Sequence, residues 1–254
     1  MMATAETGVP SPSSLPLFFR KLVPVAAETH GAAHLDRGSG FLYAGGATAL
    51  PLGLGEFGMA AMDYPIVFAP EVAHGALAVT GIREAENLFV DGEGKWRKGT
   101  YVPAYVRAYP FILIDVTGSD RLVLGVDPEA QCLARNKGVA LFEGNQPSAM
   151  LNETLQLCAA LRDQLRRTID FCTALDQAGL LVPNQAVINF TTGGRAQLQG
   201  FRVIDAAKFD ALADSVILEW RKRGWLMAIY AHFLSMQRWA RIVDFGAERL
   251  GPQA

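Results

Sequence analysis

Five residues near the middle of the chain carry side chains that can hold a small ligand. They are one tryptophan, three tyrosines and one arginine: Trp96, Tyr101, Tyr105, Arg107 and Tyr109. A guanidinium group stacks on aromatic rings and forms paired hydrogen bonds with a carboxylate, so this cluster fits a planar or anionic molecule. The same side chains would also fit the interior and rim of an ordinary core. The sequence favours this second interpretation, and the ligand site is a hypothesis.

Histidines and cysteines elsewhere in the chain give no sign of a metal site. His30 and His34 have the spacing of two ligands on one helix face, but no HExxH glutamate lies between them and glycines surround them. The cysteines, Cys132, Cys158 and Cys172, lack the CxxC spacing of zinc and redox sites. We therefore expect loop histidines, buried reduced thiols, no metal and no cofactor.

Two further groups of residues admit a functional and a structural interpretation. His232 lies off the apolar stripe of the last predicted helix, and we expect a hydrogen-bonded structural histidine rather than a catalytic base. Arg162, Arg166 and Arg167 lie off the stripe of an earlier helix, with Asp163 beside them. They could form a basic binding face, but a solvated helix surface is the more common role of such charges.

Length and composition favour one soluble domain. The chain has 254 residues, of which 50% are hydrophobic and 19% are charged, enough to bury a large core. Its formal net charge of -2 gives no overall basic field, so nucleic acid is not expected as a partner. No apolar run is long enough to span a membrane, and residues 1–16 lack the features of a secretory signal. These observations predict a cytoplasmic protein.

Short strands dominate the first half of the chain and must position the aromatic cluster. The segments with strand character are residues 17–26, 65–70, 76–82, 87–91, 111–116 and 121–126. Residues 111–114 form an uninterrupted apolar run, which we take as a buried strand at the centre of an antiparallel layer. A short helix at residues 100–109 would carry Arg107 just ahead of this strand.

The second half of the chain is mainly helical. Residues 148–177 predict one long amphipathic helix, with Ser148 as a cap and Gly179 as its end. Its expected apolar stripe consists of Leu151, Leu155, Cys158, Leu161, Leu165, Ile169, Cys172 and Leu175. A hairpin with a Gly-Gly turn follows, with strands at residues 186–190 and 197–203, and Asp205 then caps a helix. The last helix is expected at residues 225–245.

The predicted fold class is α+β. It consists of an antiparallel β layer with a long amphipathic helix, a C-terminal hairpin and a terminal helix packed on it. We expect a single domain over residues 17–245, a disordered tail at residues 1–16 and a C-terminal tail at residues 246–254. The sequence does not predict an oligomeric state.

Ordered blocks of residues resemble the signature segments of the bacterial SapC family. In the first half these blocks are YPIVF at residues 64–68, ENLFVD at 86–91, GKW at 94–96 and YVPAYVR at 101–107. In the second half they include RT at 167–168, FC at 171–172, LL at 180–181, GF at 200–201 and IYAH at 229–232. The resemblance covers residues 17–243, nearly the whole chain. Ala108 departs from it, since a second basic residue is expected there in many relatives.

The resemblance implies a link to the bacterial surface layer or its assembly. The name refers to a surface-array protein gene region, and the family is distinct from the transporter permease of the same name, which would need membrane spans. Some relatives look to be encoded near TonB-dependent receptors and flavin-dependent tryptophan-halogenase-like proteins, which implies a role in an envelope-linked uptake or modification pathway. The family gives no catalytic residues that can be assigned to positions of this sequence.

Two function hypotheses follow. The first is a non-catalytic binding or assembly protein linked to the bacterial envelope or surface layer, with an envelope or surface-layer protein as its partner. The second is an accessory enzyme or small-molecule-binding protein in an envelope-linked uptake or modification pathway with halogenase-like partners. Because no catalytic constellation stands out, the sequence favours a non-catalytic role and leaves enzymatic activity open.

Overall fold

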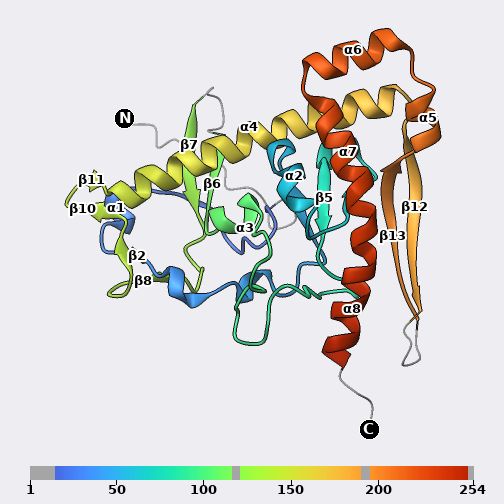
Figure 1. The fold of residues 1–254 in the computed structure, drawn as a ribbon. Helices are drawn as coiled ribbons and strands as arrows, with labels where there is room; N and C mark the ends of the chain where they lie inside the picture. Colours follow the sequence, from blue (N-terminus) through green and yellow to red (C-terminus); the bar gives the residue numbers. More distant parts are fainter. Residues whose placement is uncertain (1–14, 116–120, 190–194, 251–254) are drawn as a thin grey trace. The chain divides into compact units, whose positions relative to one another are not determined.

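The computed structural model describes residues 15–115, 121–189 and 195–250 (Figure 1). Its helices and antiparallel sheets confirm the predicted α+β class. The chain divides into two compact units, which we describe separately: Met1–Gly40 with Arg107–Arg162, and Phe41–Val106 with Asp163–Ala254. The single domain expected over residues 17–245 stays a prediction. Most of the expected N-terminal tail lies outside the described residues.

The first unit contains a three-stranded antiparallel sheet with the order β1-β7-β6. β6 (Phe111–Asp115) and β7 (Leu122–Val126) form the predicted hairpin, whose turn lies outside the described residues. β1 (Val23–Pro24) is much shorter than the strand expected over residues 17–26. Proline has no N–H to donate to a neighbouring strand, which explains why Pro24 lies in an edge strand.

β6 does not occupy the central position that its apolar run predicts. It is the edge strand opposite β1, and Ile112, Leu113 and Ile114 are only partly buried, although Phe111 is fully buried. Side chains alternate between the two faces of a strand, so a continuous apolar run is fully buried only where both faces are covered. The prediction of an interior strand was therefore wrong.

Short elements complete the first unit. They are α1 (Ala27–His30), β2 (His34–Leu35), η2 (Arg37–Ser39), β8 (Leu133–Ala134), β9 (Val139–Ala140), β10 (Phe142–Glu143) and β11 (Gln146–Pro147). β2 pairs with both β8 and β9 in a second small sheet. His30 ends α1 and His34 begins β2, so the two histidines do not share a helix face.

A five-stranded antiparallel sheet with the order β12-β13-β4-β5-β3 supports the second unit. Its strands are β3 (Ala49–Leu52), β4 (Ile66–Phe68), β5 (Ala76–Val79), β12 (Leu181–Asn189) and β13 (Arg195–Ile204). The hairpin of β12 and β13 was expected to pack on the β layer. Instead it extends the sheet edge to edge, because β13 pairs with β4 at Arg202 and Phe68. The strand expected at residues 87–91 is reduced to one bridge between Val90 and Trp96.

The long helix α4 (Ala149–Gln177) confirms its prediction and runs from the first unit into the second. Ser148 Oγ accepts a hydrogen bond from the Leu151 N–H at 3.2 Å, as a cap should, and Gly179 follows the end with a φ of 69°. The buried face differs from the predicted stripe at two positions, since Leu155 and Ile169 are each 37% exposed.

The remaining helices belong to the second unit, except that α3 (Ala104–Ala108) crosses the boundary between units. They are η3 (Leu42–Ala44), η4 (Leu54–Glu56), α2 (Phe57–Ala60), η5 (Val72–His74), α5 (Ala206–Asp210), α6 (Asp214–Lys222), α7 (Trp225–Ser235), η6 (Met236–Arg238) and α8 (Trp239–Leu250). Asp205 caps α5 as expected. The predicted last helix is interrupted by η6, and α8 continues through residues 246–250, which the sequence assigned to a tail.

The core of the second unit lies between its sheet, α4 and α7. Aromatic side chains dominate it, including Tyr64, Phe68, Phe89, Phe171 and Trp225. Phe171 of α4 approaches Phe68 of β4 at 6.3 Å and Trp225 of α7 at 5.7 Å between ring centroids. These contacts fix α4 and α7 against the sheet, and so they position the surfaces described next.

Candidate functional site

Two residues of the predicted aromatic cluster pack against the core of the second unit. The ring of Trp96 is edge-on to Phe41 at a centroid distance of 5.5 Å. The Tyr101 hydroxyl donates to Glu56 Oε1 at 2.8 Å, and its backbone N–H donates to Asp63 Oδ2 at 2.7 Å. Both residues also contact the main hydrophobic cluster, so each has a structural role.

The other members of the predicted cluster are divided between the two units. Tyr105 is buried in α3 and belongs to the second unit, while Arg107 is exposed and belongs to the first. Tyr109, also in the first unit, donates from its hydroxyl to Asp127 Oδ2 at 3.1 Å, and its ring meets that of Phe19 at 5.3 Å. A common ligand site for the five residues stays a prediction.

Glu56 is a buried carboxylate that the sequence did not single out. It is 8% exposed and accepts hydrogen bonds from the N–H groups of Gly53 at 3.0 Å and Ala104 at 2.6 Å, besides the Tyr101 hydroxyl. Three donors satisfy its two oxygens, as burial of a carboxylate requires. Glu56 therefore anchors the segment before α3 to η4.

His232 is a structural histidine, as the sequence predicted. Its side chain is 1% exposed; Nδ1 donates to the Ile66 carbonyl at 2.8 Å and Nε2 accepts from the Ile204 N–H at 3.1 Å. Burial lowers the pKa of His232 to about 4, so the ring is neutral at pH 7. Both nitrogens are occupied by backbone groups of β4 and β13.

The three cysteines are free and buried, which confirms the prediction of reduced thiols. Burial raises the pKa of Cys132 to about 11 and the pKa values of Cys158 and Cys172 to about 12. Since the thiolate is the reactive form, these side chains are poor nucleophiles at neutral pH. The described residues contain no group of three or more potential metal ligands.

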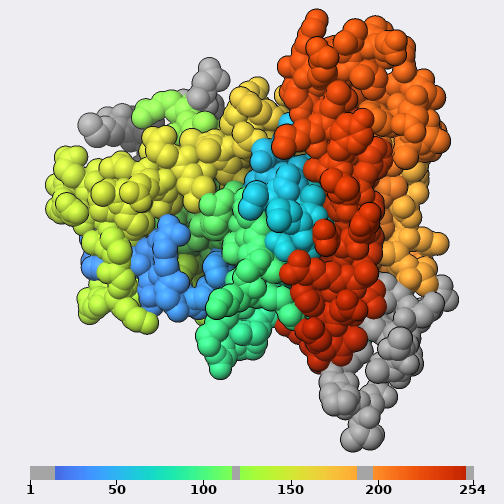
Figure 2. All heavy atoms as spheres, viewed as in Figure 1, coloured from blue at the N-terminus to red at the C-terminus, as the bar shows by residue number. Residues whose placement is uncertain are grey.

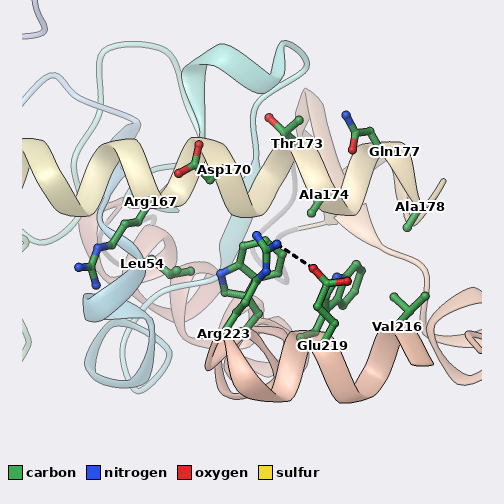
Figure 3. A pocket seen from close by; sticks show the side chains of 12 residues that line it. Leu54, Arg167, Asp170, Thr173, Ala174, Gln177, Ala178, Val216, Glu219 and Arg223 are labelled. Carbon is green, nitrogen blue, oxygen red and sulfur yellow. Dashed lines mark ion pairs between the residues drawn. The ribbon is translucent and has the colours of Figure 1, made fainter. Parts of the chain in front are cut away.

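A cavity of about 770 Å³ lies between α4 and α6 in the second unit, and we call it the α4–α6 cavity (Figure 3). Its base is apolar. Trp220 and Trp225 are 5% and 7% exposed and meet at a centroid distance of 6.0 Å. Ala174 of α4 and Ala178, just after the end of α4, point toward α6, and their small side chains leave room between the helices.

Charged side chains line the rim of the α4–α6 cavity. The Arg223 guanidinium lies over the Trp225 ring, 4.8 Å from its centroid, and pairs with Glu219 at 2.7 Å. Arg167 pairs through Nε with Asp163 at 2.8 Å, and Asp170 also lines the cavity. The sequence named Arg167 as part of a possible basic face, but nothing in it pointed to Arg223 or to the two tryptophans.

An apolar surface covers α7, the adjoining helix α2 and the turn that follows α2 in the second unit. It consists of Met59, Met62, Met227, Tyr230 and Leu234, which are between 54% and 74% exposed, and we call it the α2–α7 stripe. The two helices pack together, and Figure 2 shows them side by side on one face. A helix that is apolar on every side, as WLMAIYAHFL is, would have been a sequence signal for this surface.

Positive charges flank both ends of α7. Arg238 donates to the Ala61 carbonyl and Arg241 to the Met62 carbonyl, each at 3.3 Å, which places both guanidinium groups beside the end of α2. Arg221, Lys222 and Arg223 immediately precede α7. Arg241 pairs with Asp63 and Arg223 with Glu219, so three of these five cations have no carboxylate partner among the described residues.

The structure defines an α+β protein with a ligand-sized cavity and an exposed apolar surface. The family model SapC matches residues 25–242, so the chain belongs to the SapC family. No curated protein and no solved structure matches the chain. Among the described residues, no helix has both the length and the hydropathy to cross a membrane.

The blocks that carry the family resemblance meet in the core of the second unit. Ile66, from the block at residues 64–68, accepts a hydrogen bond from His232, of the block at residues 229–232. The Ile66 N–H also donates to Ser235 Oγ at 2.9 Å. These signature segments therefore hold the strands and α7 together.

Proposed function

We propose that this SapC protein is a non-catalytic binding protein whose α2–α7 stripe docks on a protein of the bacterial envelope or surface layer. The supporting observation is the exposure of five large apolar side chains on α7, α2 and the turn after α2. Contiguous exposed apolar surface is typical of interaction sites, and flexible methionine side chains adapt to the shape of a partner.

Charge around the stripe favours a partner other than a second copy of this chain. In a symmetric dimer, either a parallel or an antiparallel arrangement of α7 would bring the cations at its two ends against cations of the other copy. A protein segment that combines apolar side chains with flanking carboxylates avoids this repulsion. We therefore propose an acidic amphipathic segment as the partner element.

Family membership supports the envelope link in this proposal. We further propose that the protein acts from the cytoplasm, at the inner side of the envelope. Fractionation of the native cells, followed by immunodetection of the chain in each fraction, tests this location.

Photo-crosslinking tests the docking surface directly. A photo-crosslinking amino acid is placed at Met227 or Tyr230 in the native bacterium, and at Leu218 as a control, since Leu218 is 50% exposed on α6 outside the stripe. We expect one envelope protein to be crosslinked from both stripe positions and not from the control. The purified pair should then bind more weakly as salt rises, because the partner is acidic.

A substitution within the stripe provides the second part of this test. Leu234 is 63% exposed, so Leu234→Glu should leave the fold intact and weaken binding of the purified partner at least tenfold. Leu218→Glu is the matched control and should leave binding unchanged. Crosslinks to a second copy of the chain, or equal binding by Leu234→Glu, would refute the proposal.

The α4–α6 cavity favours the second candidate function, a small-molecule-binding protein or accessory enzyme in an envelope-linked uptake or modification pathway. Its volume of about 770 Å³ is typical of small-molecule sites. Halogenase-like partners are supported by the family resemblance alone.

A further inference from the structure

The α4–α6 cavity combines an aromatic base with guanidinium groups at its rim. We propose that it binds a small organic monoanion, a carboxylate attached to a planar apolar body. This inference deepens the second candidate function and does not depend on the α2–α7 stripe.

The base of the cavity fits the apolar part of such a ligand. Trp220 and Trp225 provide aromatic surface, and Leu54 adds an aliphatic contact from η4. Ala174 and Ala178 leave a gap between α4 and α6 that larger side chains would fill (Figure 3). A planar ring system inserted there would contact the small part of the two indole rings that stays exposed, 5% of Trp220 and 7% of Trp225.

Arg223 is placed to hold the carboxylate. Stacking on Trp225 orients the guanidinium, and its pairing with Glu219 uses one of its two terminal nitrogens. A guanidinium has five N–H donors, so others stay available for a ligand. Arg223 and Glu219 have side chains that are 54% and 56% exposed, so their ion pair adds little stability and yields readily to a ligand carboxylate.

Arg167 supplies a second anion-binding group at the rim. Its Nε atom is the one that pairs with Asp163, and its terminal nitrogens have no acceptor among the described residues. Figure 3 shows Arg167 at the opposite end of the lining from Val216. The lining therefore offers a ligand carboxylate a second guanidinium besides Arg223.

The charge balance of the rim favours a single negative charge. Of the residues that line the cavity, Arg167 and Arg223 are positive and Glu219 and Asp170 are negative, and Arg167 pairs with Asp163 outside the lining. A polyanion such as a nucleoside triphosphate would meet these two carboxylates without enough cations to compensate. A cationic ligand would be repelled by both guanidinium groups. A monoanion adds only one negative charge to the lining, and the Glu219 carboxylate that it displaces from Arg223 is 56% exposed and returns to water.

Calorimetric titration of the full chain with naphthalene-2-carboxylate tests the inference. Naphthalene-2-carboxamide is the neutral control of the same shape. We expect the carboxylate to bind and the carboxamide to bind at least tenfold more weakly, because the amide cannot form charge-assisted hydrogen bonds. Equal binding of the two compounds, or no binding of the carboxylate at millimolar concentration, would overturn the proposal.

Matched variants assign the binding to this cavity. Arg223→Gln and Arg167→Gln should each weaken carboxylate binding several-fold, and the double variant tenfold or more. Arg221→Gln on α6 removes the same charge outside the cavity lining and should leave binding unchanged. Equal effects of the cavity and control variants would show that only overall charge matters, and the proposal would fail.

Filling the cavity provides an independent readout that keeps the arginines. Ala178 is exposed at the lining, so Ala178→Phe should fold normally and abolish binding of both naphthalene compounds. Full binding by Ala178→Phe would place the ligand elsewhere and overturn the inference. Leu234→Glu, which disrupts the α2–α7 stripe, should leave naphthalene-2-carboxylate binding unchanged, so failure of one proposal is distinguishable from failure of the other.

Discussion

Replacing His232 tests the hydrogen bonds that join α7 to two strands. The ring is 1% exposed and connects the Ile66 carbonyl with the Ile204 N–H. Leucine has similar bulk and no polar atoms, so His232→Leu leaves both backbone groups buried without this partner. Each such loss costs about 1 to 3 kcal/mol, and we expect the free energy of unfolding to fall by about 2 to 6 kcal/mol at pH 7.

The same histidine gives stability a defined dependence on pH. Burial lowers the pKa of His232 to about 4, below its ordinary value of 6.5. Between these values the unfolded chain binds a proton that the folded protein does not, so stability is lost as pH falls from 6.5 to 4. The loss attributable to His232 is about 1 kcal/mol at pH 5.5 and about 3 kcal/mol at pH 4.

Urea unfolding between pH 7 and pH 4.5 measures both effects. Glutamine offers one donor and one acceptor but does not titrate, so His232→Gln should flatten the pH dependence relative to the parent chain. His74→Gln is the control, because the His74 side chain is 68% exposed, and it should keep the parental slope. If the parent and His232→Gln lost equal stability between pH 6.5 and pH 5, the assignment of a neutral buried histidine would be refuted.

Two further predictions concern buried groups. Glu56→Gln replaces one acceptor oxygen by a donor that faces backbone N–H groups. Urea unfolding should show that the free energy of unfolding falls by about 2 to 4 kcal/mol. Glu84→Gln is the exposed control and should change the free energy of unfolding by less than about 0.5 kcal/mol. A loss no larger than that of the control would contradict the role of Glu56. Cys158 and Cys172 should resist a thiol-specific chromogenic reagent at pH 8 and react once urea unfolds the chain, because burial raises their pKa values to about 12; rapid labelling of the native thiols would contradict this.

Local sequence signals predicted the elements whose ends are fixed by short-range chemistry. The cap at Ser148, the glycine at position 179 and the regular spacing of apolar residues between them specify α4 without help from distant residues. Asp205 likewise caps α5 through hydrogen bonds to residues two and three positions later. Such interactions depend on neighbours in sequence, so a pattern can reveal them.

The positions of strands within the sheets could not be predicted, because they depend on pairing between distant parts of the chain. The apolar run at residues 111–114 has the composition of an interior strand. It is an edge strand because β6 pairs with β7 on one side and with no strand on the other. In the same way, the hairpin of β12 and β13 was predicted, whereas its attachment to β4 depends on residues more than 100 positions away. Strand composition does not encode position within a sheet.

The candidate sites also depend on contacts between residues that are far apart in the sequence. The aromatic residues near Arg107 were predicted to form a cluster because they are close in sequence, yet Trp96 and Tyr101 pack against the core of the second unit. Arg223 and Trp220 line a cavity only because α6 faces the C-terminal part of α4, about fifty residues earlier in the chain. A pattern within α6 alone could not have identified them.

Burial separates two roles among the residues that carry the SapC resemblance. Ile66, Phe171 and His232 are buried and hold the second unit together, so their identity follows from the fold. Arg167 and Tyr230 belong to the same blocks but are exposed, although the Tyr230 ring also meets the buried Phe209 at a centroid distance of 5.9 Å. Arg167 lines the α4–α6 cavity and Tyr230 lies in the α2–α7 stripe. Signature residues at both surfaces are what a protein with a ligand site and a separate docking site would carry.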